Sequence, residues 1–144
     1  MRAGKRALEH SSYVEAVEHA TNGLQSLEVL PETARRVEHE VALCLILGQA
    51  LEATQGFAAA VVERTYSRAR ALCQHLDDPT ALTQALIGLR HYYLMRGPLH
   101  KALEVGEEFL RLAQRQQKPS MVQLGHFAVG LPLMCLGKFT AALP

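Results

Sequence analysis

The segment ALIGLRHYYLMRGPLHKALEVGEEFL, residues 85–110, has the pattern of two helices joined by a Gly-Pro turn. After Gly97, apolar and small residues recur at steps of three and four, a spacing that places them on one helix face. They are Ala102, Leu103, Gly106, Phe109, Leu110 and Ala113. A chain that reverses after a helix commonly needs a left-handed residue, which glycine supplies most easily. The stretch therefore predicts an antiparallel helical hairpin.

The turn glycine recurs on both sides of this hairpin. Gly56 lies 41 residues before Gly97, and Gly137 lies 40 residues after it. Asp78 before Pro79 and the proline at position 119 mark further helix starts. We expect hairpins over residues 1–30, 33–76, 79–117 and 120–144, the first and last incomplete. The expected helices lie near residues 2–10, 13–29, 33–54, 58–75, 80–95, 99–116 and 120–136, followed by the start of an eighth.

Composition narrows the class of protein. The chain has 144 residues, 49% of them apolar, and its 15 Lys and Arg residues nearly balance 14 Asp and Glu residues. This composition excludes a disordered linker and argues against a dedicated nucleic-acid binder. No apolar run approaches the roughly 20 residues that span a bilayer, and no secretory signal is recognisable. We expect a cytoplasmic protein with neither a nucleic-acid nor a membrane partner.

These segments resemble tetratricopeptide repeats (TPR). The likeness lies in the small residue of the first helix, the aromatic residue or leucine one turn later, the turn glycine, and the small residue of the second helix. The period of about 40 exceeds the usual 34 of this repeat, which indicates lengthened helices. The resemblance implies an all-α, right-handed superhelix of antiparallel hairpins, a TPR-like α-solenoid of three to four repeats in one domain over residues 1–144.

A more specific resemblance covers ATQGFAAAVVERTYSRARALCQHLDDP, residues 53–79, together with residues 85–110. Both segments are similar to the C-terminal repeats of large bacterial signalling proteins. In those proteins the repeats follow a STAND-type ATPase, often behind an adenylate/guanylate cyclase or a Ser/Thr kinase domain. This chain has no GxxxxGK[ST] loop and no cyclase or kinase motif, so ATP binding is not carried over. We expect a fragment whose exposed repeat ends favour self-association.

Stacked hairpins present one concave surface, lined mainly by the first helix of each pair. Carried over from the resemblance, the partner-binding positions would be Leu45, Gln49, Glu52, Gln84, Ile87, His91, Met95, Leu124, Phe127, Leu131 and Met134. Such a groove suits an amphipathic helix or a neighbouring segment of its own parent protein. Alternatively, Ile87, Phe127 and Leu131 are core residues, because apolar stripes at helical spacing usually face a core.

The residue pattern disfavours a catalytic or metal-binding site. His39 points about 140° away from Cys44 around the helix, and the adjacent Glu107 and Glu108 diverge. The chain has no HExxH motif and no CxxC pair, so we expect no catalytic residue, metal or cofactor, and each cysteine is expected to be a small buried hydrophobe. The alternatives are part of a nucleotide cyclase or ATPase, and the inducer-sensing region of a transcriptional regulator.

Overall fold

The computed structural model describes the backbone of residues 2–31, 33–76 and 78–142, and the side chains of residues 12–141 except 32 and 77. Within these residues every regular element is helical, which confirms the all-α class. The elements are α1 (Arg2–Glu28), α2 (Ala34–Gln55), α3 (Ala60–Cys73), α4 (Pro79–Arg96), α5 (Leu99–Gln116), α6 (Pro119–Cys135) and the short 3-10 helix η1 (Phe139–Ala142).

The expected helix bounds agree with the structure to within two residues from α2 to α6. The prediction was wrong for the N-terminal segment, where residues 2–10 and 13–29 were expected to form separate helices. One continuous helix, α1, runs from Arg2 to Glu28 instead, so the described residues 2–30 contain no hairpin. Serines occupy positions 11 and 12, between the two expected helices. A serine inside a helix costs only about 0.5 kcal/mol, whereas a break would leave several backbone N–H and C=O groups without hydrogen-bond partners.

The predicted turn glycines adopt the expected positive φ angles. Gly56, Gly97 and Gly137 have φ values of 85°, 105° and 74°, and they follow α2, α4 and α6. The N–H of Gly97 donates to the carbonyl of Tyr93, 3.0 Å away, which closes the last turn of α4. At the start of α4, Oδ1 of Asp78 accepts from the N–H groups of Thr80 and Ala81, as a helix-capping side chain does.

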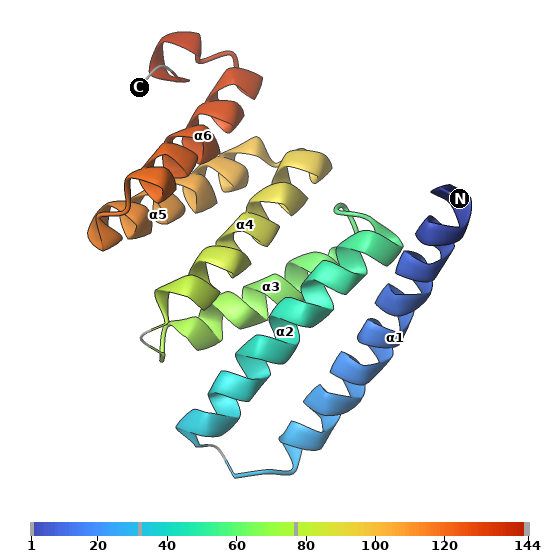
Figure 1. Cartoon of the computed structure of the whole chain (residues 1–144). Helices are drawn as coiled ribbons and strands as arrows, with labels where there is room; N and C mark the ends of the chain where they lie inside the picture. The colour runs from blue at the N-terminus through green and yellow to red at the C-terminus, as the bar shows by residue number, and fades with distance from the viewer. Residues whose placement is uncertain (1, 32, 77, 143–144) are drawn as a thin grey trace.

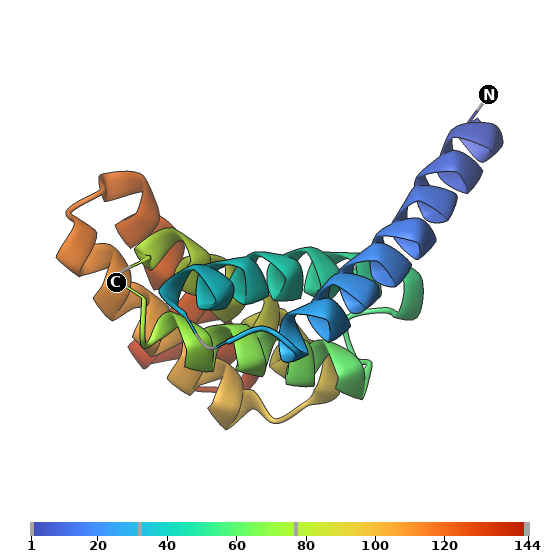
Figure 2. The same ribbon diagram turned by 90° about the horizontal axis from the view of Figure 1, so that it is seen from below.

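Consecutive helices run antiparallel, and each packs against its neighbour in the chain (Figure 1). α2, α4 and α6 lie in front of α3 and α5 in this view, and α2 also contacts α4. Figure 2 shows α2 and α4 above α3, with the N-terminal part of α1 projecting away from the other helices. Two helical layers result, and α2, α4 and α6 form one of them.

Tyr66 of α3 occupies the junction of three helices. Its ring is 3% exposed and lies against Gly48 of α2 and Gly88 of α4. A Cβ atom added at Gly48 would stand 2.6 Å from the ring, and one added at Gly88 would stand 2.3 Å from it. The two mid-helix glycines therefore serve close helix contact, since a methyl group at either position would collide with the ring.

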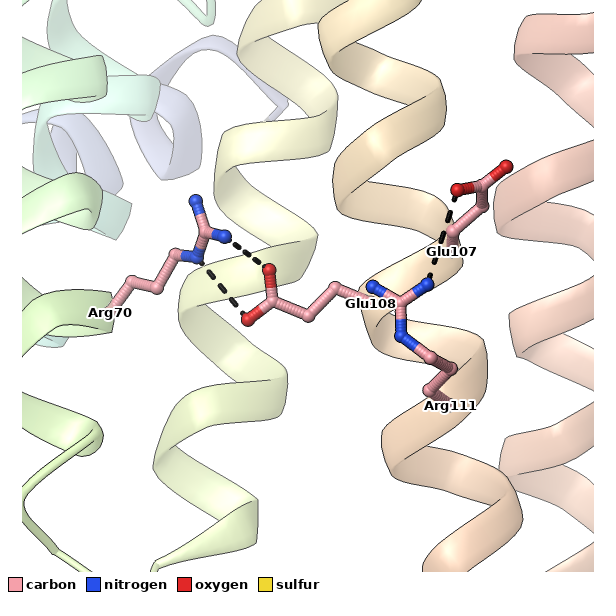
Figure 3. Close-up of polar contacts among 4 residues, drawn as sticks. All are labelled: Arg70, Glu107, Glu108 and Arg111. Carbon is pink, nitrogen blue, oxygen red and sulfur yellow. Dashed lines mark hydrogen bonds and ion pairs between the residues drawn. The ribbon is translucent and has the colours of Figure 1, made fainter.

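Polar side-chain contacts join α3 to α5 and to α4. Arg70 of α3 pairs with Glu108 of α5 through two contacts, and its Nε lies 3.3 Å from Oε1 of that carboxylate. Figure 3 shows Glu107 turned the other way, towards Arg111, which confirms that the adjacent carboxylates diverge. The Tyr93 hydroxyl of α4 similarly donates to Glu63 of α3 over 2.7 Å.

Candidate functional site

A pocket of about 220 Å³ lies between α2 and α4, with Tyr66 of α3 at its base. Five of the predicted groove residues line it together. The lining consists of Gln49 and Glu52 from α2, Tyr66 from α3, and Gln84, Ile87, Gly88 and His91 from α4. The pocket forms here because Gly48 and Gly88 admit the Tyr66 ring between the helices, so that neighbouring polar side chains stand around it.

Glu52 is the acidic group of the pocket. Its Oε1 atom is buried without a hydrogen-bond partner among the described residues. Burial raises the pKa of Glu52 above 4.5, and the adjacent Tyr66 hydroxyl opposes this effect by favouring the ionised carboxylate. Burial also raises the pKa of Tyr66, an effect that the Glu52 charge reinforces. The pocket therefore holds a carboxylate acceptor that the described protein leaves partly unsatisfied.

His91 is half-buried on the opposite wall. Burial, together with the positive charge of Arg90, lowers the pKa of His91 below 6.5. The imidazole is therefore neutral at neutral pH, and one of its nitrogens is free to accept a hydrogen bond. The Phe57 ring, from the turn between α2 and α3, packs edge-on against His91 with 5.6 Å between ring centroids.

Arg90 links this pocket to α6. The residue is 6% exposed, and its Nε and Nη1 have no hydrogen-bond partner among the described residues. Its guanidinium carbon lies 5.8 Å from the centre of the Phe127 ring, a cation–π distance. Burial lowers the pKa of Arg90. The contact joins Phe127 of α6 to α4, one residue along the chain from His91 of the pocket lining.

Further exposed apolar side chains lie on α6 and α4. Phe127 is 57% exposed, and Met95, Leu124 and Met134 are also exposed, while Leu131 is partly buried. We call the pocket residues together with these side chains the α2/α4/α6 face. It consists of Gln49, Glu52, Tyr66, Gln84, Ile87, Gly88, His91, Met95, Leu124, Phe127, Leu131 and Met134.

One predicted groove residue is misplaced. Leu45 is 7% exposed and belongs to the hydrophobic core, so it does not line the pocket with Gln49 and Glu52. Residues four apart on a helix are offset by about 40°, and this rotation turns Leu45 inward. Ile87 lines the pocket while also packing against the core, so both interpretations of this residue hold.

Two residues of the site were missed by sequence reasoning. Tyr66 and Arg90 were not among the expected groove positions, although both shape the face. The signal for Arg90 was a single charge inside the otherwise uncharged stretch from residue 80 to residue 95. No comparable signal marks Tyr66, because an aromatic residue at a helical core position is ordinary.

The cysteines and histidines give a mixed outcome. Cys44 and Cys73 are buried, as expected, and burial raises the pKa of each thiol to about 11, which disfavours a nucleophilic thiolate. His39 has its Nδ1 2.7 Å from the carbonyl of Arg35 and is exposed, in agreement with its predicted separation from Cys44. The prediction was wrong for Cys135, which is exposed at the end of α6. Across the described part of the chain, no three His, Cys, Asp or Glu residues are grouped as metal ligands would be.

Replacing Glu52 by glutamine is expected to stabilise the fold at pH 7. Because burial raises the pKa of Glu52, the ionised carboxylate destabilises the folded state above that pKa. This penalty disappears as the pH falls and the carboxyl group takes up a proton. Since the residue is only half-buried, we expect a gain of about 0.5 kcal/mol in the free energy of unfolding. Urea denaturation should show this gain at pH 7 and a smaller one at pH 4. A loss of stability at pH 7 would contradict the prediction.

None of the helices in the described residues is long and apolar enough to cross a membrane. The chain matches no protein-family model, no curated protein and no solved structure.

Proposed function

We propose that this chain is a non-catalytic helical-repeat scaffold that binds a protein segment on its α2/α4/α6 face. The recurring unit would be a TPR-like hairpin of about 40 residues, and the hairpins would continue as a right-handed superhelix. The supporting features are the positive-φ glycines after α2, α4 and α6, and the predominance of packing between consecutive helices. Such an array presents an extended surface rather than a closed catalytic centre.

The pocket between α2 and α4 is the feature that most directly supports the proposal. The pocket brings together Gln49, Glu52, Gln84, Ile87 and His91 from two helices. Arg90, next to His91 in the chain, contacts the exposed Phe127 ring of α6. Its volume of about 220 Å³ is below the roughly 300–1,000 Å³ of typical small-molecule sites. A mixed surface of this kind suits an amphipathic helix, which places apolar residues on one side and single polar groups at their edge.

The segment would come from another protein or from another domain of the same parent protein. The resemblance to bacterial ATPase and cyclase signalling proteins favours the second source, with the repeats acting as a cytoplasmic regulatory region. Self-association through the repeat ends is part of this proposal. Exposed apolar residues occur near both ends of the described chain, such as Val14 of α1 and Phe139 of η1.

The test uses an 18-residue fluorescent peptide designed as an amphipathic helix, with leucines on one face and a single lysine at their edge. Phe127→Ala should weaken its binding at least tenfold, about 1.4 kcal/mol, because exposed aromatic residues often dominate interfaces. Val29→Ala is the control, since Val29 is 85% exposed and lies outside the face. Equal binding by both variants and the wild type would exclude the face. A separate assay measures ATP hydrolysis by the purified chain. If the chain hydrolysed ATP and a single substitution abolished this activity, the non-catalytic proposal would be wrong.

A further inference from the structure

We infer that the pocket between α2 and α4 receives the positively charged end of a lysine or arginine side chain from the bound segment. The inference rests on the proposed function for the source of that side chain. It goes beyond that function by naming the chemistry that the pocket selects. The inference is based on four polar residues that line one small pocket, namely Glu52, Gln49, Gln84 and His91.

Charge within the pocket favours a cation. Glu52 is the acidic residue of the lining, and the remaining lining residues are amide, aromatic, apolar or imidazole groups. Because burial and Arg90 lower the pKa of His91, this ring contributes no positive charge at neutral pH. The Arg90 charge opposes a cation, but its guanidinium lies beside Phe127 and does not line the pocket. The lining therefore carries a net negative charge when Glu52 is ionised.

Hydrogen-bond capacity also favours a donor ligand. Glu52 Oε1 is buried and unpartnered within the described residues, and burying an unpaired polar atom is unfavourable. The Gln49 and Gln84 side chains are exposed at the rim and provide amide oxygens, and the neutral His91 ring provides a nitrogen acceptor. A lysine ammonium group brings three donors and an arginine guanidinium five. Either group would satisfy the orphaned carboxylate oxygen and form charge-assisted bonds with it.

The apolar parts of the pocket suit the stem of such a side chain. Ile87 lines the pocket and the Tyr66 ring forms its base. Lysine and arginine carry their charge on several methylene groups, which pack against apolar surface while the charged end reaches a polar site. The exposed Phe127 and Met95 would then contact the apolar face of the same bound helix.

The test compares the lysine-containing 18-residue peptide with the same peptide carrying norleucine at that position, at pH 7 and 150 mM salt. We expect the lysine peptide to bind the wild type at least tenfold more tightly. Glu52→Gln should abolish this preference, while Glu104→Gln should preserve it, because Glu104 is exposed on α5 outside the face. Gln84→Leu, an exposed rim variant, should reduce the preference without affecting the fold. Circular dichroism checks that every variant is folded.

Each result has a distinct consequence. Equal binding of both peptides to the wild type would overturn the cation inference and leave the proposed binding face standing. If neither peptide binds, a second experiment tests whether the pocket binds a cation at all. N-acetyl-lysine methylamide is added at millimolar concentration, and the protein is observed by nuclear magnetic resonance. Shifts in the Gln49 and Gln84 side-chain amide signals would support the cation pocket, whereas the failure of both peptides to bind would overturn the proposal that the face binds an amphipathic helix. No shifts would overturn both.

Discussion

Tyr66→Ala is expected to lower the free energy of unfolding by about 3–5 kcal/mol, the usual cost of truncating a large buried aromatic residue. The ring is 3% exposed and contacts both Gly48 and Gly88, so its loss leaves a cavity where α2, α3 and α4 meet. Small domains are stable by roughly 5–15 kcal/mol, and the variant would lose a large share of that margin. Urea denaturation followed by circular dichroism measures the change.

Two controls isolate the role of the ring. Tyr66→Phe removes only the hydroxyl group and should cost about 1 kcal/mol. Tyr13→Ala removes an aromatic residue that is 43% exposed on α1, and it should change stability by less than about 0.5 kcal/mol. If Tyr66→Ala were no more harmful than Tyr66→Phe, the ring would not be the junction of the three helices.

Gly106→Ala should destabilise the chain by about 1–3 kcal/mol, the typical cost of overpacking a close contact. Alanine is normally favoured over glycine inside a helix by about 1 kcal/mol, so this is a reversal of the usual trend. The reason is that a Cβ atom at Gly106 of α5 would stand 2.5 Å from the backbone oxygen of Ala128 in α6. A backbone atom cannot turn away as a side chain does, so the two helices must separate.

Gly23→Ala provides the matched control for this substitution. A Cβ atom at Gly23 of α1 would meet the Cδ1 methyl group of Leu43 at 3.0 Å, and that side chain can change its rotamer. We expect the Gly23 variant to be neutral or more stable by up to about 1 kcal/mol. Thermal unfolding of both variants measures the difference, and equal stabilities would show that α5 and α6 are not in close contact at Gly106.

The local structure from α2 to α6 was predictable because the short-range signals in the sequence are strong. The spacing of apolar residues predicted the helices from α2 to α6. The glycines at positions 56, 97 and 137 predicted the turns that follow α2, α4 and α6. The break expected near residues 11 and 12 was wrong, because weak local preferences do not end a helix.

The candidate site was predictable only in part. Gln49, Glu52, Gln84, Ile87 and His91 meet in one pocket because they occupy matching positions on two helices of the same layer. Helical rotation moved Leu45 from this set into the core.

Contacts between helices that are distant in sequence had no local signal. The pairing of Arg70 with Glu108 depends on how α3 and α5 pack, and the cation–π contact of Arg90 with Phe127 depends on α4 and α6. Neither spacing nor composition specifies these distances, since they arise only when the helices are assembled. The same holds for the Tyr66 ring between Gly48 and Gly88.

The most direct test of the binding face is a nuclear magnetic resonance titration of the labelled protein with the lysine-containing peptide. We expect the largest backbone and side-chain shifts on the α2/α4/α6 face, including Glu52, His91 and Phe127. Shifts concentrated instead on the opposite layer, around Arg70 and Glu108, would contradict this expectation.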